Sequence, residues 1–148
     1  MDRGRRPFNN NRRQNNNQDS FQVAEVTQKL SKEFSDPVAL YLESGKAYQY
    51  AKAFSNIKNH QMRKILDGVK EAVTAAKNGD FETGRKKMFV LVAMTAYNAG
   101  RLKGDMNKLY TFISKTINEK SIKDADDIYA FDQFFTSIVA YHTKIARG

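Results

Sequence analysis

Hydrophobic residues recur at steps of three and four through most of the 148-residue chain, which is the spacing of one face of an α-helix. No stretch shows the alternation of hydrophobic and polar residues that is typical of a strand. Asp, Asn, Pro and Gly residues lie where such helices would begin or end. The pattern therefore predicts an all-α protein: a compact bundle of about five core helices, preceded by a short helix.

The boundary residues place the expected helices. Asp36-Pro37 is a strong helix start, because an N-cap acid precedes proline at the first helical position. Asn78-Gly79 suits a helix end, because glycine readily adopts the left-handed conformation there. Asp19, Asn59 and Asp80 are the other expected N-caps. The predicted helices span about residues 19–34, 36–54, 59–78, 80–104, 105–117 and 128–145.

Two of these helices are expected to dominate the core. The segment 88–97 is hydrophobic on nearly every side, which is typical of a helix surrounded by others, so it should be the central helix of the bundle. The last helix carries one continuous hydrophobic seam at alternating steps of three and four: Ile128, Phe131, Phe135, Ile138, His142 and Ile145.

The first 18 residues differ from the rest in composition. They contain five arginines, six asparagines and one acid, with almost no hydrophobic side chains. Such a segment cannot bury enough surface to offset the entropy of ordering it. The sequence therefore predicts a disordered arm at residues 1–18 and a single helical-bundle domain at residues 19–148.

The net charge of +9 is concentrated in two places. The arm carries five bases and one acid, net +4, and residues 60–103 carry nine bases and four acids, net +5. Residues 19–58 and 104–148 are balanced. This distribution favours a surface that faces a polyanion, although a basic excess also serves solubility alone.

One helix presents a basic stripe. Arg63, Lys70 and Lys77 lie seven residues apart, so the stripe is about 21 Å long, comparable to a few successive phosphates of a nucleic-acid strand. Asp67 lies on the same face and neutralises part of it. The stripe is a candidate RNA-backbone contact, and an ordinary solvated helix face is the alternative.

Further basic residues flank the hydrophobic segment 88–97. Consecutive residues of a helix point about 100° apart, so only one or two of residues 85–87 can face one ligand, and Arg85 is the candidate. Arg101 and Lys103 lie beside Gly100 and Gly104, where the small residues allow the backbone to approach a phosphate. Two helix-ending glycines with bases that complement the helix dipole explain the same pattern equally well.

The residues needed for catalysis or metal binding are scarce. The chain has no cysteine and only two histidines, and the cluster of Asp124, Asp126 and Asp127 is better explained by helix capping. It has no phosphate-binding glycine loop and no nucleophile elbow. We expect a protein that is not an enzyme and that needs no metal or cofactor.

No membrane contact is expected. The longest strongly hydrophobic stretch, 88–97, is about half of the ~20 residues needed to cross a bilayer. The N-terminus lacks the hydrophobic region of a signal peptide. The sequence therefore predicts a soluble, cytoplasmic protein.

Three aromatic side chains near or within these helices need a role. Tyr97 and Tyr141 lie near basic residues and are candidates for stacking on bases, although aromatic residues at helical spacing more often belong to a core. His142 lies on the hydrophobic seam, where a single histidine is more often a packed, hydrogen-bonded core residue than a catalyst.

Four segments between residues 48 and 144 occur in the order of a known family: AYQYAKAF, NHQMRKILDGVKEA, KKMFVLVAMTAYNAGR and FDQFFTSIVAYHTK. The Gln-Met-Arg-Lys pattern at 61–64, the pattern ending in Arg101 and the pattern ending in His142 carry the similarity. Together the segments cover about two-thirds of the chain. The chain resembles the small subunit of the type III-A CRISPR effector, the Csm ribonucleoprotein.

This resemblance implies a non-catalytic helical subunit of an antiviral complex. Several copies would stack along the complex beside other subunits and contact the duplex of guide RNA and target RNA. Arg63, Lys64 and Arg101 match the basic positions of the family and are expected to contact RNA backbone. Tyr141 and His142 match its C-terminal signature and are expected to hold the fold or a subunit contact, a role in which we also place Tyr97. The arm and residues 19–34 are not covered by the resemblance.

Two other functions remain open from the sequence. The chain is alternatively a free-standing helical adapter whose basic face binds an acidic protein, and an exposed hydrophobic patch beside the basic stripe would favour this function. A helical DNA-binding regulator is less favoured, because the most basic helix continues into a hydrophobic segment rather than forming a polar recognition helix.

Overall fold

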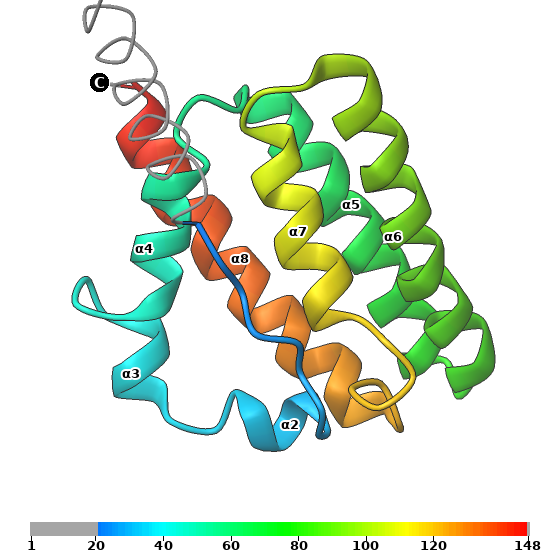
Figure 1. The fold of residues 1–148 in the computed structure, drawn as a ribbon. Coiled ribbons are helices and arrows are strands. Elements are labelled where there is room, and N and C mark those ends of the chain that lie inside the picture. Colours follow the sequence, from blue (N-terminus) through cyan, green and yellow to red (C-terminus); the bar gives the residue numbers. More distant parts are fainter. Residues whose placement is uncertain (1–20, 148) are drawn as a thin grey trace, which may run out of the picture.

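The computed structural model describes residues 21–147, and the regular elements in this range are all helices (Figure 1). The prediction of an all-α bundle is confirmed. The predicted arm, residues 1–18, and the predicted Asp19 cap lie outside the described residues. The helices are α2 (Leu30–Glu33), α3 (Pro37–Tyr41), α4 (Lys46–Ala53), α5 (Asn59–Lys77), α6 (Phe81–Leu102), α7 (Met106–Thr116) and α8 (Ala125–Arg147).

The central helix of the bundle is α8, not α6. Helix α8 packs against α4, α5 and α2, and also against α3 and α6. Its seam residues Phe131, Phe135 and Ile138 are completely buried. The predicted seam is confirmed, and it lies at the centre because neighbours cover it along its whole length.

The prediction that segment 88–97 is the central helix is wrong. Helix α6 packs on α5 and α7 and only lightly on α8, so it lies at the edge of the bundle (Figure 1). Met88 and Leu91 are buried, whereas Met94 is 51% and Tyr97 67% exposed. Hydrophobic residues on every side do not by themselves bring a covering helix, because the chain supplies neighbours for only part of the circumference.

The predicted helix 36–54 is two helices. Asp36 does cap the first, since its carboxylate accepts a hydrogen bond from the N–H of Ala39 at 3.3 Å. The chain then leaves the helix at Leu42 and starts α4 after Gly45. A Cβ atom at Gly45 would lie 2.6 Å from the carbonyl oxygen of Ala39, so the chain can fold back this closely only with glycine.

Residues 21–29 are not helical, and the predicted helix 19–34 is reduced within the described range to the single turn of α2. The extended segment finds its backbone partners in the α7–α8 region instead. The N–H of Val26 donates to the carbonyl of Lys115 at 2.9 Å, and the Asn118 amide donates to the carbonyl of Val26 at 3.0 Å. These long-range bonds, with Val26 and Leu30 buried, replace the helix that their spacing predicted.

The predicted ends of α5 and α6 are largely correct. Gly79 ends α5 with a φ of 84°, and the Asp80 carboxylate accepts the N–H of Thr83 at 3.1 Å at the start of α6. Asn59 is not the N-cap of α5. That position is taken by Lys58, whose side chain makes no capping bond.

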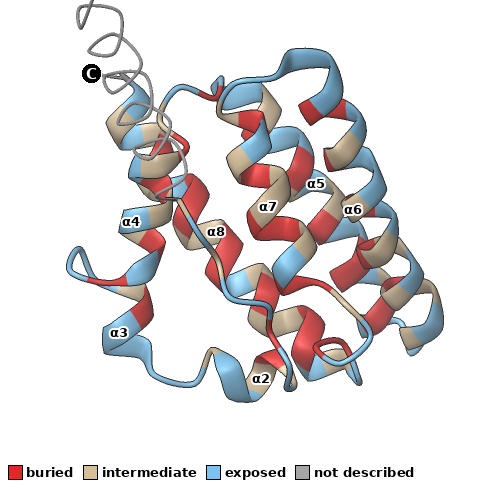
Figure 2. Cartoon of the chain, viewed as in Figure 1, coloured by how far each residue is buried: buried red, intermediate tan, exposed pale blue. Residues whose placement is uncertain are grey.

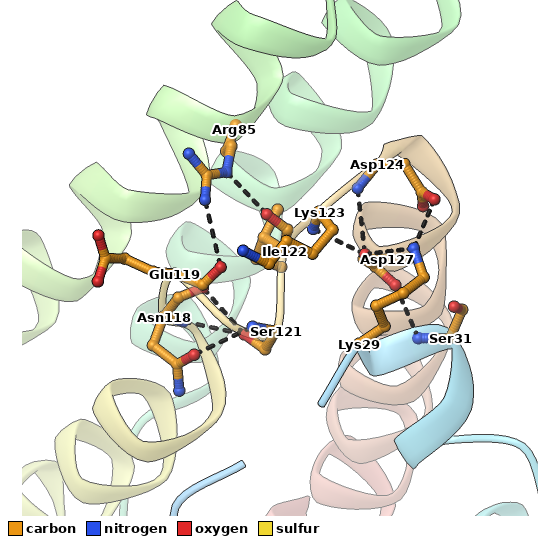
Figure 3. A network of polar contacts seen from close by, with 10 residues as sticks. All are labelled: Lys29, Ser31, Arg85, Asn118, Glu119, Ser121, Ile122, Lys123, Asp124 and Asp127. Atoms are coloured by element: carbon orange, nitrogen blue, oxygen red, sulfur yellow. Dashed lines mark hydrogen bonds and ion pairs between the residues drawn. The ribbon is translucent and has the colours of Figure 1, made fainter. Parts of the chain in front are cut away.

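A buried carboxylate joins α2 to the start of α8 (Figure 3). Asp127 is completely buried and accepts hydrogen bonds from the N–H groups of Ser31 at 2.9 Å and Lys123 at 2.7 Å. The ammonium of Lys29 lies 3.2 Å from the same carboxylate. Burial alone would raise the pKa of Asp127, but the donors from Ser31, Lys123 and Lys29 outweigh it and lower the pKa below its ordinary value.

Candidate RNA-binding surface

Helices α5 and α6 form an antiparallel hairpin joined by the turn at residues 78–80 (Figure 1). The first turns of α5 therefore lie beside the last turns of α6. Basic side chains from both helices gather at this end of the hairpin, which we call the basic end: Lys58, His60, Arg63, Lys64, Arg101 and Lys103. All six are exposed, and within residues 21–147 none of them forms a salt bridge.

The backbone adds to the positive potential of the basic end. Helix α5 starts here with no acidic residue in its first turn and no side-chain cap, so its N-terminal N–H groups are left for another acceptor. A cavity of about 310 Å³ opens beside this start and is lined by Lys58, His60 and Lys103, together with Asp105. The Asp105 carboxylate is held by Lys108 at 3.4 Å, which reduces its repulsion of an anion.

The chain turns sharply after α6. Lys103 and Gly104 both have a φ of 60°, and the Lys103 ammonium donates to the carbonyl of Gly100 at 3.2 Å. This turn places Lys103 across from the start of α5. The sequence pointed to Lys103 through the neighbouring glycines, and the structure shows that one of them has the left-handed backbone conformation.

Tyr97 and Arg101 are neighbours on the exposed side of α6. The guanidinium carbon of Arg101 lies 5.7 Å from the centre of the Tyr97 ring, which is within the range of a cation–π contact. Tyr97 is 67% exposed and does not belong to the core. The pair holds a cation and an aromatic face together at the border of the basic end.

The stripe of Arg63, Lys70 and Lys77 does not act as one uniform surface. The Lys70 ammonium pairs with Asp132 of α8 at 2.8 Å, and Lys77 lies in the last turn of α5, at the opposite end of the hairpin. Arg63 alone of these three lies at the basic end. Tertiary pairing therefore divides a stripe that sequence spacing made continuous.

Arg85 has a structural contact that the sequence did not indicate (Figure 3). Its Nε donates to the carbonyl of Ile122 at 2.7 Å, and its Nη2 to the carbonyl of Glu119 at 3.3 Å. The guanidinium also lies 4.7 Å from the centre of the Phe89 ring. Arg85 thereby holds the α7–α8 loop against α6.

Tyr141 and His142 make contacts within the fold. The Tyr141 hydroxyl donates to the carbonyl of Tyr41 at 2.7 Å and so fixes α3 to α8. His142 is completely buried, and its Nε2 lies 3.0 Å from the carbonyl oxygen of Phe54 and 2.8 Å from that of Ile57. The imidazole therefore holds the α4–α5 connection onto the central helix.

A second surface, which sequence reasoning missed, lies between α5 and α6. This α5/α6 groove has a volume of about 530 Å³, and hydrophobic residues such as Leu91, Val90 and Met94 line it beside Gly68. Lys64 and Lys86 stand at its edges. The groove was missed because α6 was expected to be surrounded by other helices.

Two further searches concern residues 21–147 only. No cluster of three or more His, Asp or Glu side chains there is arranged to hold a metal ion. In the same range, none of the helices combines the length and hydrophobicity that a membrane span requires.

Comparison with known proteins identifies the family. The family model described as Csm2 Type III-A matches residues 40–147, which includes every helix from α4 to α8 and the whole basic end. Searches of curated proteins and of solved structures gave no match. The family match covers well over half of the chain and agrees with the resemblance carried by the motifs around Arg63, Arg101 and His142. The chain therefore belongs to the Csm2 family, the small subunits of the type III-A Csm effector complex.

Proposed function

We propose that this chain is a non-catalytic, RNA-binding subunit of the type III-A effector, and that the basic end contacts the backbone of the guide RNA–target RNA duplex. The observation that carries the proposal is the gathering of Arg63, Lys64, Arg101, Lys103 and Lys58 at one end of a rigid hairpin without salt-bridge partners. Unpaired cations on a fixed scaffold are free to neutralise phosphates.

The chemistry of this surface suits a complex whose guide changes from one target to the next. Lysine and arginine side chains bind phosphates and carry no sequence information by themselves. The uncapped start of α5 adds backbone N–H donors, which also recognise phosphate rather than bases. Several copies stacked along the duplex, together with the other Csm subunits, would repeat this contact.

A double charge reversal tests the basic end. In the effector complex assembled with guide RNA, Arg63→Glu with Arg101→Glu should weaken capture of target RNA by about tenfold or more at low salt, because several phosphate contacts are lost or become repulsive. Affinity of the unmodified complex should fall as salt rises and should be the same for unrelated guide–target pairs. Filter binding over a salt series measures both effects.

The matched control is Lys115→Glu with Lys120→Glu. Both residues are exposed and lie near the end of α7, away from the basic end, and the change in net charge is the same. This control should retain most of the affinity. Equal losses in both double variants would show that only net charge matters, and the proposed site would then be wrong. Circular dichroism checks that all variants keep their helix content.

A helical adapter that binds an acidic protein is the second candidate, and the α5/α6 groove favours it. The groove places exposed hydrophobic side chains, Val90 and Met94, beside Lys64 and Lys86. This is the arrangement of a protein-docking surface, in which a hydrophobic centre is bordered by charge. The two functions are separable, since an adapter would be unaffected by the Arg63 and Arg101 reversals and would retain full partner binding without RNA.

A further inference from the structure

The large hydrophobic side chains that are exposed among residues 21–147 fall on two surfaces. Val38 and Leu42 form the α3 patch, and they are 62% and 54% exposed. Val90, Met94, Tyr97 and Leu102 form the α6 patch. The two patches lie on opposite sides of the molecule, α3 at one edge and α6 at the other (Figure 1), and Figure 2 shows exposed residues along both helices. Two separate uncovered hydrophobic surfaces call for partners.

The charges around the two patches are opposite. Residues 33–45 contain three acids, Glu33, Asp36 and Glu43, and no lysine or arginine, although Lys32 and Lys46 lie just outside this range. All three acids are exposed. The α3 patch is therefore a hydrophobic surface with an acidic border.

The α6 patch has a basic border. Lys64, Lys86 and Arg101 are exposed beside it and form no salt bridge within the described part of the chain. Two acids, Asp67 and Glu71, also line the groove, but Glu71 is paired with Lys87 at 3.5 Å. The local excess is positive, so the α6 patch complements the α3 patch in both hydrophobicity and charge.

We propose that copies of this chain stack head to tail, with the α3 patch of one copy docked on the α6 patch and α5/α6 groove of the next. The inference rests on the proposed function, which requires several copies in one complex, and it assigns the two surfaces that join them. Because the patches lie on opposite sides, each docked copy leaves one patch of each kind free, so the contact continues as an open stack rather than closing into a pair.

A symmetric pair formed through two α6 patches is disfavoured by the same charges. It would bring Lys64, Lys86 and Arg101 of one copy toward the same residues of the other. Like charges placed together across an interface oppose association. The α3 patch, in contrast, supplies carboxylates beside Val38 and Leu42.

Cysteine cross-linking tests the arrangement, and the absence of native cysteine makes it clean. Val38→Cys and Met94→Cys place one exposed thiol in each patch. With a short bismaleimide, the full-length double-cysteine chain should give a ladder of dimers, trimers and longer species. Each single-cysteine chain alone should give none, and an equimolar mixture of the two should stop at the dimer. The reaction is run on the purified chain and on the complex co-expressed with guide RNA and the other Csm subunits.

Other patterns would overturn the inference. Dimers from the Met94→Cys chain alone would show a symmetric contact, and no products from any sample, including the complex, would show that other surfaces join the copies. The control pair Val38→Cys with Lys115→Cys keeps the α3 thiol but moves the second thiol off the α6 patch, so a ladder from it would reveal nonspecific collisions.

The test separates this inference from the proposed RNA contact. RNA capture that depends on Arg63 and Arg101 while no ladder forms would overturn the stacking surfaces and leave the RNA-binding function standing. A ladder from a complex whose RNA affinity is unaffected by the Arg63 and Arg101 reversals would support the stacking surfaces and overturn the RNA-binding site.

Discussion

Helices α8 and α6 are the two longest helices of the described chain, and both are rich in hydrophobic residues, yet the fold treats them differently. Neighbours surround α8 and bury its seam completely, whereas α6 keeps Val90, Met94 and Tyr97 exposed. The difference does not follow from hydrophobicity alone. It arises because α2, α3, α4 and α5 all turn their hydrophobic faces toward α8, and only α5 and α7 pack extensively on α6.

The largest expected effect comes from a cavity on the covered helix. Phe131→Ala removes a completely buried ring that stacks on Phe135 with centroids 5.7 Å apart. We expect the free energy of unfolding to fall by about 3–5 kcal/mol, since the packed side chains around it cannot collapse to fill the space. Urea denaturation followed by circular dichroism measures the change. A loss below about 1 kcal/mol would mean that α8 is not the centre of the core.

A smaller effect, with a pH signature, is expected at the start of α8. Asp127→Asn removes the charge that the donors from Ser31, Lys123 and Lys29 stabilise, and should lower the free energy of unfolding by about 1.5–3 kcal/mol near neutral pH. The folded-state pKa of Asp127 is lowered, so its contribution is present above the unfolded pKa of about 3.9 and disappears as the pH falls through the folded pKa.

The difference in stability between wild type and Asp127→Asn should therefore shrink below about pH 4. Asp126→Asn is the matched control, because Asp126 is exposed in the same helical turn and should contribute less than about 1 kcal/mol through the helix dipole. A difference for Asp127→Asn that stays constant from neutral pH down to acid unfolding would exclude the carboxylate charge as its source.

The smallest effect on stability is expected on the uncovered helix. Met94→Ser changes a side chain that is 51% exposed, so the free energy of unfolding should change by less than about 0.5 kcal/mol. The same change should reduce assembly, because Met94 lies in the α6 patch. Urea denaturation and sedimentation velocity of the full-length chain give the two readouts. A large loss of stability would indicate that Met94 is covered within the monomer, and the contrast between α6 and α8 would then fail.

The site illustrates what sequence patterns can and cannot locate. Arg63, Lys64, Arg101 and Lys103 were all identified from spacing or motif, and their meeting at one end follows once α5 and α6 pair antiparallel. Lys58 was missed because it lies in a segment whose charges balance, although its place just before the α5 start was a usable signal.

Pairing across the fold is what sequence spacing did not show. Lys70 belongs to the predicted stripe, but its partner Asp132 is 62 residues away in the chain. Arg85 was chosen from a basic run, and its acceptors are carbonyl groups of the α7–α8 loop. Whether a cation is free for a phosphate depends on such long-range partners.

The sequence by itself determined the all-α class, the capping of α3 by Asp36 and of α6 by Asp80, the end of α5 at Gly79 and the hydrophobic seam of α8, because short-range backbone and packing rules govern these features. Only the tertiary structure decided which helix is central, where residues 21–29 find their hydrogen bonds and which cations stay unpaired. These outcomes depend on contacts between segments distant in the chain, and local patterns carry no information about which distant surface will be available.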